Sequence, residues 1–365
     1  MSRKQWFERY RPRTVDEMIG NNALRASLFA EIVRGLSHCL FFGPPGSGKT
    51  TMALAIARQL FPYAEDFKRR VLELNASKDC GIKVVREKIA NFVKQKTSMQ
   101  QCSRDPANPV RLPAVRIVIL DEADRMTHEA QAALRQMTED YGRNGVRFFL
   151  LCNYKSDIIE PLVSRCLQVP FGAPPHDEIV TRLGRIAQVE GLMAHMTSKE
   201  AAKQVFSHVA QQSHGDMRLA MHWLQHLTLE QRTASEKRSA QYFIDRIDIM
   251  SGSLPQRSLN KLLNILLAVP ANGCFTPSQD DWTANAQALV LDRGLSVGKC
   301  FEQLSEALPA RAIDDKSSHV VAEILFRLAR GSVSLHSGGG DPALLLYALY
   351  HSSVAHDVHD TVAVQ

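Results

Sequence analysis

The chain has 365 residues, which at roughly 150 residues per domain is enough for two or three domains that each bury a hydrophobic core. Its 45% hydrophobic and 22% charged residues are typical of soluble globular proteins and argue against wholesale disorder. The seven cysteines include no C-x-x-C pair, so we expect reduced intracellular thiols rather than a disulfide framework or a zinc site. No apolar run reaches about 18 residues and the N-terminus is too charged for a signal peptide, so we expect neither secretion nor a membrane partner.

The net charge of +6 is unevenly distributed along the chain. Residues 1–170 carry 27 basic and 18 acidic side chains, whereas residues 171–365 carry 17 and 20. A basic front half is expected of a protein with a polyanionic partner, although charge differences of this size also arise without one.

Short apolar runs alternate with helix-length segments in the front half. Buried strands are predicted at residues 39–42, 71–74, 117–120 and 148–151. Helices are predicted at 49–60 and 82–96, the second with Val85, Ile89, Phe92 and Val93 on one face. Strands that alternate with helices indicate an α/β fold with a parallel sheet. Residues 96–113, rich in Ser, Gln and Pro, are expected to form an exposed loop.

The rear half is predicted to be helical only. Helical spacing of apolar residues predicts helices at 176–190, 198–212 and 216–228, with Gly191 and Gly215 between them. The polar stretch 233–239 is interpreted as a linker, and further helical patterns follow, including 259–269, 320–330 and 343–351. The expected domains are therefore 1–171, 172–232 and 240–365.

One motif points to phosphate binding. Gly43-Pro-Pro-Gly-Ser-Gly-Lys-Thr50 fits G-x-x-x-x-G-K-[ST], follows an apolar strand and opens a helix, which is the context that a phosphate-binding loop requires. Backbone N–H groups and the helix N-terminus would face phosphate oxygens. Lys49 would reach the β and γ phosphates and Thr50 would bind Mg²⁺. The alternative is a simple glycine turn.

Two carboxylates follow the third predicted strand, at Asp121 and Glu122. The carboxyl edge of a parallel sheet is where open α/β sheets bind ligands, so Asp121 is expected to hold Mg²⁺. Glu122 would polarise the attacking water as general base. Carboxylates also end strands as solvated caps, which is the alternative for this pair.

At this point the sequence resembles the AAA+ ATPases, and within them the small subunits of replication factor C, the eukaryotic and archaeal sliding-clamp loader. Besides the phosphate loop, the resemblance is carried by residues 6–12, 73–77, 81–86, 119–124, 126–127, 131–135, 152–154, 159–161, 164–166 and 215–218. It is specific to about residue 228. The resemblance implies an AAA+ core at 1–171, a helical lid at 172–232 and a helical collar for oligomerisation at 240–365.

The resemblance also implies site roles. Asn153 would position the attacking water, or merely cap a turn. Arg218 would reach from the lid to the γ-phosphate, or be a solvated residue at a helix start. Arg165 would enter the ATP site of a neighbouring subunit in trans, or form an intramolecular ion pair. The implied nucleotide-binding residues are Tyr10, Arg11, Pro12, Gly43, Pro44, Pro45, Gly46, Ser47, Gly48, Lys49, Thr50 and Thr51.

In replication factor C the helix that corresponds to 82–96 follows the DNA backbone, so Lys83 and Arg86 are expected to contact DNA unless they form a solvated face. The sequence departs from the family's pattern at Lys78 and Cys80, just before this helix, and at Gln136, further along the chain after Glu122. The implied partners are the other subunits of a hetero-pentamer, a ring-shaped sliding clamp and primer–template DNA. The implied location is the nucleus.

The sequence therefore predicts an ATPase subunit of a clamp loader, with ATP and Mg²⁺ as its ligands. Two alternatives stay open. A branch-migration or unwinding motor shares the loop and the sensor residues, and a scaffold subunit would bind ATP with little turnover.

Overall fold

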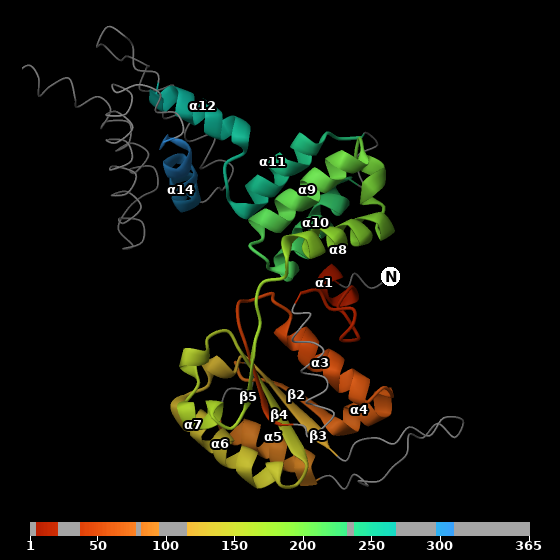
Figure 1. The fold of residues 1–365 in the computed structure, drawn as a ribbon, viewed down its shortest axis with the longest axis vertical. Helices are drawn as coiled ribbons and strands as arrows, with labels where there is room; N and C mark the ends of the chain where they lie inside the picture. The colour runs from red at the N-terminus through yellow and green to blue at the C-terminus, as the bar shows by residue number, and fades with distance from the viewer. Residues whose placement is uncertain are drawn as a thin grey trace, which may run out of the picture. The chain divides into compact units, whose positions relative to one another are not determined.

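The computed structural model describes residues 5–20, 37–77, 82–94, 115–231, 237–267 and 297–309 (Figure 1). The chain divides into two compact units, Met1–Ala194 with Val209–Ala234, and His195–His208 with Ser235–Gln365. The predicted loop at 96–113, most of the linker at 233–239 and the predicted helices at 320–330 and 343–351 lie outside the described residues. No described helix has the length and apolar character needed to cross a membrane.

Five parallel strands form the centre of the first unit. They are β1 (Cys39–Phe42), β2 (Val71–Asn75), β3 (Arg116–Asp121), β4 (Val146–Cys152) and β5 (Leu167–Pro170), in the spatial order β2-β3-β4-β1-β5. All neighbouring pairs are parallel, which confirms the predicted sheet. The edge strand β5 was not predicted because only Val169 of its four residues is buried, so it lacks the apolar run that marks the other strands.

Helices cover both faces of this sheet (Figure 1). Successive strand residues point to opposite faces. Phe41 and Phe149 pack with α3 (Lys49–Leu60), and α4 (Ala64–Arg70) packs at the same layer through Phe67. Leu40 and Phe148 pack on the other face with α5 (Ile82–Lys94), α6 (His128–Gly142) and α7 (Glu160–Val163). The result is a three-layer sandwich with two apolar cores.

The remaining helices of the first unit lie beyond β5 in sequence. They include α8 (His176–Val189), the short helix η3 (Leu192–His195) and α10 (Met217–Gln231), while α9 (Lys199–Gln212) spans the boundary between the units. These bounds confirm the three helices predicted in this stretch to within about three residues. The N-terminal helix α1 (Trp6–Arg9) joins the unit through its first residue, because the Trp6 N–H donates to Gln225 Oε1 of α10 at 3.0 Å.

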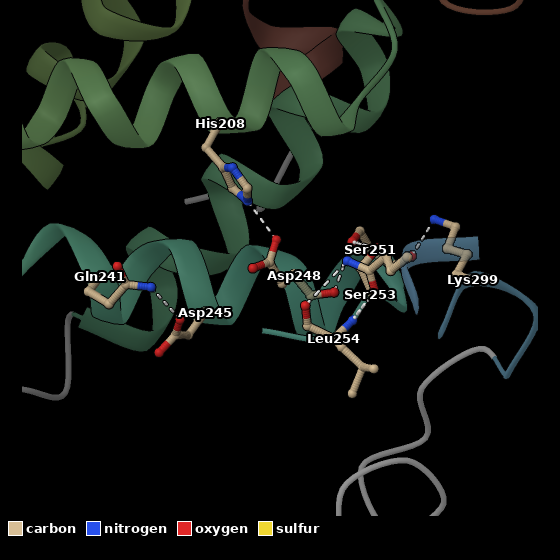
Figure 2. A network of polar contacts seen from close by, with 9 residues as sticks. His208, Gln241, Asp245, Asp248, Ser251, Ser253, Leu254 and Lys299 are labelled. Carbon is tan, nitrogen blue, oxygen red and sulfur yellow. Dashed lines mark hydrogen bonds and ion pairs between the residues drawn. The ribbon is translucent and has the colours of Figure 1, made fainter. Parts of the chain in front are cut away.

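The second unit contains α11 (Ala240–Ser251), α12 (Gln256–Leu267) and α14 (Val297–Ala307). A polar network links its elements (Figure 2). His208 Nε2 lies 2.6 Å from Asp248 Oδ1, and Asp248 is buried in α11. Lys299 Nζ donates to the Ser251 carbonyl at 2.6 Å, and the Leu254 N–H donates to Gln303 Oε1 at 2.7 Å. These bonds satisfy polar groups where α11 ends and α14 packs.

Candidate nucleotide-binding site

The phosphate loop connects β1 to α3. Gly48 is the N-cap of α3 at φ 96°, and Gly46 has φ 70°. Both values lie in the left-handed region, which glycine adopts without a steric penalty. A Cβ on Gly46 would also lie 2.0 Å from Asp216 Oδ1, so this position has no room for a larger residue. The loop therefore depends on its glycines for its shape.

Lys49, the first residue of α3, is buried. Its Nζ donates to the Gly43 and Pro44 carbonyls at 2.8 and 2.9 Å, and to Asn153 Oδ1 at 3.0 Å. Burial lowers the pKa of Lys49, and the charge of nearby Asp121 opposes that shift. Three acceptors thus hold an ammonium group at the mouth of the loop.

Asp121 ends β3 and faces α3. Its Oδ2 accepts a hydrogen bond from Thr50 Oγ1 at 3.0 Å, and its Oδ1 accepts one from the Glu122 N–H at 3.0 Å. The strand register that aligns β3 with β4 brings this carboxylate to the same edge as Asn153. Two hard oxygen atoms, one hydroxyl and one carboxylate, therefore lie side by side at the start of α3.

Glu122 has an unusual backbone. Its φ of 56° is left-handed, a conformation that costs a non-glycine residue of order 1–3 kcal/mol. Such strain clusters at functional sites. Its carboxylate forms an ion pair with Arg125, the two side chains being 37% and 67% exposed. The sequence did not predict this pair.

Asp124 anchors Asn153. Its Oδ2 accepts a hydrogen bond from the Asn153 N–H at 2.9 Å, and its Oδ1 is buried without a hydrogen-bond partner among the described residues. Asn153 is the first residue after β4, so this bond fixes the position of the Asn153 backbone, from which its side chain extends. The sequence reasoning missed this role, because an acid two residues after Glu122 gives no sign of its backbone partner. The signal that could have indicated this role is Asp124 itself, the third acidic residue between Asp121 and Asp124.

A cavity of about 210 Å³ adjoins the loop. The predicted site residues that line it are Tyr10, Arg11, Pro12, Pro45, Gly46, Ser47, Gly48, Lys49, Thr50, Thr51, Asp121, Glu122, Asn153 and Arg218. Gly43 and Pro44 do not line it but supply two of the carbonyls that hold Lys49. The structure thus gathers the predicted residues from the N-terminal segment, the loop, two strand ends and α10.

Residues that no motif singled out complete the cavity wall. Arg182 of α8 donates from Nη2 to the Tyr10 carbonyl at 2.9 Å and lines the cavity. The Tyr10 hydroxyl donates to the Glu190 carboxylate, and burial together with that bond raises the pKa of Tyr10 to about 12. Met18 and Met221 add apolar surface. The N-terminal segment is therefore fixed to α8 at the wall of the cavity.

Arg218 and Arg165 have different surroundings. The Arg218 guanidinium lies 5.6 Å from the centre of the Phe7 ring, at the cavity wall. Arg165 does not line the cavity; its Nη2 pairs with Glu139 Oε1 at 2.7 Å and its Nη1 donates to the Pro161 carbonyl at 2.6 Å. The intramolecular ion pair considered from the sequence is thus present in this structure.

The two residues predicted to contact DNA lie on α5, and Arg86 does not line the cavity. Arg86 is exposed on this helix, and Val85, Ile89 and Phe92 are buried beneath it, as the sequence predicted. The Lys83 side chain, Lys78 and Cys80 lie outside the described residues, whereas Gln136 is exposed on α6.

Several known proteins are similar in sequence to this chain. The family described as "ATPase family associated with various cellular activities (AAA)" matches residues 39–171. Replication factor C small subunit 1 of Pyrobaculum arsenaticum is 35% identical over 348 residues, covering 94% of this chain and 92% of that protein. The chain belongs to the replication factor C small subunit family. It is therefore an AAA ATPase with a parallel α/β fold.

Two further similarities are found. Replication factor C subunit 4 of Caenorhabditis elegans is 43% identical over 223 residues, which cover 61% of this chain and 62% of that protein. Among solved structures, the Thermotoga maritima RuvB Holliday junction branch migration motor aligns at 18% identity with a TM-score of 0.49, over 82% of this chain and 91% of that chain.

Proposed function

We propose that this chain is an ATP-hydrolysing subunit of a multi-subunit sliding-clamp loader that acts on primer–template DNA. The observation that carries the proposal is the convergence of Lys49, Thr50, Asp121 and Asn153 on one cavity, in a chain of the replication factor C small subunit family. The proposed location is the nucleus, which the resemblance to eukaryotic replication factor C implies; the relatives include an archaeal protein at 35% identity over 348 residues and the Caenorhabditis elegans protein at 43% over 223.

The loop residues 43–51 are proposed to bind the ATP phosphates. The fit is supported by the buried Ser47 hydroxyl, which has no hydrogen-bond partner among the described residues and lines the cavity. Lys49 would exchange its carbonyl partners for phosphate oxygens, which are stronger acceptors because they are charged. Tyr10, Arg11 and Pro12 would border the adenine, where the Tyr10 ring offers a flat apolar face.

Thr50 and Asp121 are proposed to hold Mg²⁺. Their oxygens lie 3.0 Å apart, and hard oxygen donors of this kind are what Mg²⁺ prefers, usually one or two from the protein beside phosphates and water. When bound, the ion would neutralise charge on the β and γ phosphates.

For hydrolysis, Glu122 is the proposed general base and Asn153 the residue that orients the water. The water oxygen would form a bond to the γ phosphorus as the bond to the β–γ bridging oxygen breaks, and the water proton would pass to the Glu122 carboxylate. Lys49 and Arg218 would stabilise the charge on the transferring group. Because Asp124 fixes the Asn153 backbone, it would act through Asn153 as a positioning residue.

Arg165 is proposed to complete the ATP site of a neighbouring subunit. The Arg165 side chain is 39% exposed and does not line this chain's own cavity, which suits a group that acts in trans. Binding there would exchange Glu139 for a phosphate, another charged acceptor of bidentate geometry. An arginine supplied in this way contributes roughly 10³-fold or more in phosphoryl transfer.

DNA and the clamp are proposed partners of the assembled complex. Arg86 and Lys83 lie on α5. Contacts between such basic side chains and the DNA phosphate backbone bind DNA through charge, without reading its sequence. ATP would bring Arg218 and α10 onto the γ phosphate, a contact that ADP lacks, so the assembly would hold clamp and DNA with ATP bound and release them after hydrolysis.

The test is ATP-dependent clamp loading by the assembly that contains this chain. Lys49→Ala removes the ammonium group from the phosphate loop, so we expect hydrolysis at this site and clamp loading to fall by about 100-fold. Lys203→Ala, which removes an exposed lysine of α9, is the matched control and should change neither. Loading that continues at the normal rate without Lys49 would favour a scaffold role, and continuous strand displacement would favour a motor.

A further inference from the structure

Glu190 caps the C-terminus of α8, and its acidic side chain is only 6% exposed. Carboxylates are rarely buried to this extent unless they are paired. The Glu190 Oε1 accepts a hydrogen bond from the Tyr10 hydroxyl and lies 2.8 Å from Arg9 Nη1. The carboxylate at the end of this helix therefore holds the N-terminal segment, 180 residues earlier in the chain.

Tyr10 is held at both of its ends by α8 and its C-cap. Arg182 Nη2 donates to the Tyr10 carbonyl at 2.9 Å, and the Tyr10 hydroxyl donates to Glu190 at the far end of the ring. Burial, together with the bond to Glu190, raises the pKa of Tyr10 to about 12, so the hydroxyl keeps its proton. The Trp6 ring meets the Tyr10 ring edge-on, with centroids 6.2 Å apart, and the Arg9 guanidinium lies 5.1 Å from the Tyr10 ring centre. These contacts leave the ring little freedom to move.

Glu190 is connected to the cavity on one side only. Tyr10 lines the cavity, whereas Glu190 does not. On the phosphate side, Lys49 bonds to two loop carbonyls and to Asn153. An aromatic ring that is already fixed loses less conformational freedom when a flat base packs against it, and this strengthens binding. The contacts of Glu190 therefore affect the side of the cavity where a base would lie.

We propose that Glu190 is a positioning residue that fixes the Tyr10 ring for adenine and so strengthens the binding of ATP through its base. The proposal rests on the function proposed above, in which Tyr10 borders the adenine and the phosphate loop binds the phosphates. Glu190 acts through Tyr10 and leaves the phosphate contacts unchanged. Removal of this carboxylate therefore weakens the binding of ATP and spares the binding of a ligand that has no base.

The test is equilibrium binding of Mg–ATP, and of inorganic tripolyphosphate as a ligand without a base, to the full-length chain. Glu190→Ala frees the Tyr10 ring, which ATP binding must then order, so we expect the Kd for ATP to rise about three- to tenfold. The Kd for tripolyphosphate should stay within about twofold of its original value. Glu190→Gln keeps an oxygen that can accept from the Tyr10 hydroxyl, so its Kd for ATP should also stay within about twofold.

A double-variant cycle shows whether Glu190 acts through Tyr10. Tyr10→Phe keeps the ring and removes only the hydroxyl, so its Kd for ATP should rise about as much as that of Glu190→Ala. The double variant should bind ATP no more weakly than either single variant, since both changes remove the same bond. If thermal unfolding shows that Glu190→Ala has lost its fold, Tyr10→Phe alone decides, and an unchanged Kd for ATP in that variant overturns the proposal.

Two controls separate the possible failures. Glu200→Ala removes an exposed acid of α9 and should change neither Kd. Lys49→Ala should weaken the binding of ATP and of tripolyphosphate alike, by about tenfold or more. If Glu190→Ala raises both Kd values equally, raises neither, or adds to the effect of Tyr10→Phe, the role of Glu190 is wrong, and the loss of binding in Lys49→Ala still supports the proposed function. If Lys49→Ala binds ATP as tightly as the unchanged chain, the proposed ATP site is wrong and both proposals fall.

Discussion

The two edges of the central sheet use polar residues in different ways. At the carboxyl edge, Asp121 and Asn153 bond to side chains of other elements and border a cavity. At the amino edge, Arg116 Nη1 donates to the Phe92 carbonyl at 3.3 Å and Arg147 Nη1 to the Gly142 carbonyl at 2.7 Å. His38 Nδ1 accepts from the Phe148 N–H at 3.1 Å.

The difference concerns the kind of partner. Guanidinium groups at the amino edge are bonded to backbone carbonyls of the neighbouring helices α5 and α6, and burial lowers the pKa of Arg116 and of Arg147. These bonds satisfy backbone polar groups near the ends of helices and strands, and so contribute to stability. The side chains at the carboxyl edge bond to one another across α3, β3 and β4, where a charged ligand can replace a partner. We therefore expect changes to the polar side chains at the carboxyl edge to alter activity, and changes at the amino edge or in the backbone of the phosphate loop to alter stability.

The largest effect is expected at Gly46, where the loop meets α10. Gly46→Ala adds a left-handed alanine and displaces Asp216, whose Oδ1 caps α10 by accepting from the Arg218 and Leu219 N–H groups. The combined cost is about 3 kcal/mol, or a fall in melting temperature of about 6–10 °C. Thermal unfolding measures it.

Gly191→Ala is the matched control for this change. Gly191 has φ 81°, and a Cβ there would meet nothing within 4 Å. Only the backbone strain remains, so we expect a fall of about 2–4 °C. Equal shifts for the two variants would show that the contact between the loop and Asp216 is unimportant.

The next effect is expected at Asp124, which acts on catalysis from the carboxyl edge. Asp124→Ala removes the acceptor for the Asn153 N–H and frees the Asn153 side chain to move. We expect kcat to fall about 10- to 100-fold with the Kd for ATP unchanged within threefold, since a displacement of about 1 Å in a catalytic group has effects of this size. Steady-state kinetics and ATP binding measure both values.

Asp124→Asn tests the same bond more gently. Its amide oxygen can still accept from the Asn153 N–H, so most of the activity should remain. If Asp124→Asn and Asp124→Ala lose activity equally, the negative charge rather than the bond to Asn153 is what matters.

The smallest effect belongs to the amino edge and depends on pH. Burial, together with the charge of Arg147, lowers the pKa of His38 from 6.5 to about 4. Between these values the unfolded chain binds a proton that the folded chain does not, so stability is lost as pH falls from about 6.5 to 4. Because the ring keeps some contact with solvent, we expect about 1–2 kcal/mol.

His38→Asn supplies the comparison, because its side-chain oxygen can accept from the Phe148 N–H and does not titrate in this range. Urea unfolding at pH 4.0 and at pH 7.0 should show a smaller loss for His38→Asn than for the unchanged chain. Identical losses would mean that His38 is not responsible for the loss of stability in acid. A change in ATP affinity in His38→Asn would contradict the expectation that the amino edge serves stability alone.

Much of the fold could be predicted from the sequence. The strands β1 to β4 are short, apolar and bounded by turns, and β3 and β4 are each buried through four or more successive residues. The edge strand β5 escaped prediction because a strand with one free edge needs few buried side chains. Helix periodicity located α8, α9 and α10 because each packs one apolar face.

The parts of the site that are formed by residues close together in the sequence could be predicted. The phosphate loop and the end of β3 are sequence motifs, and Asp121 and Asn153 are neighbours because β3 pairs with β4, a pairing that the family resemblance implied. What the sequence could not show are bonds between distant segments, such as Arg182 with the Tyr10 carbonyl and Arg165 with Glu139. Such pairs depend on how helices pack, and no spacing along the chain encodes them.

The central claim is that this chain binds ATP in its own cavity and completes a neighbour's site with Arg165. Subunit mixing tests it most directly: the assembly is formed with Arg165→Ala in this chain only, and ATP binding and hydrolysis are measured at each subunit. We predict that ATP binding by this chain stays intact while hydrolysis at the adjacent subunit falls by roughly 10³-fold. Loss of hydrolysis at this chain's own site alone would contradict the account.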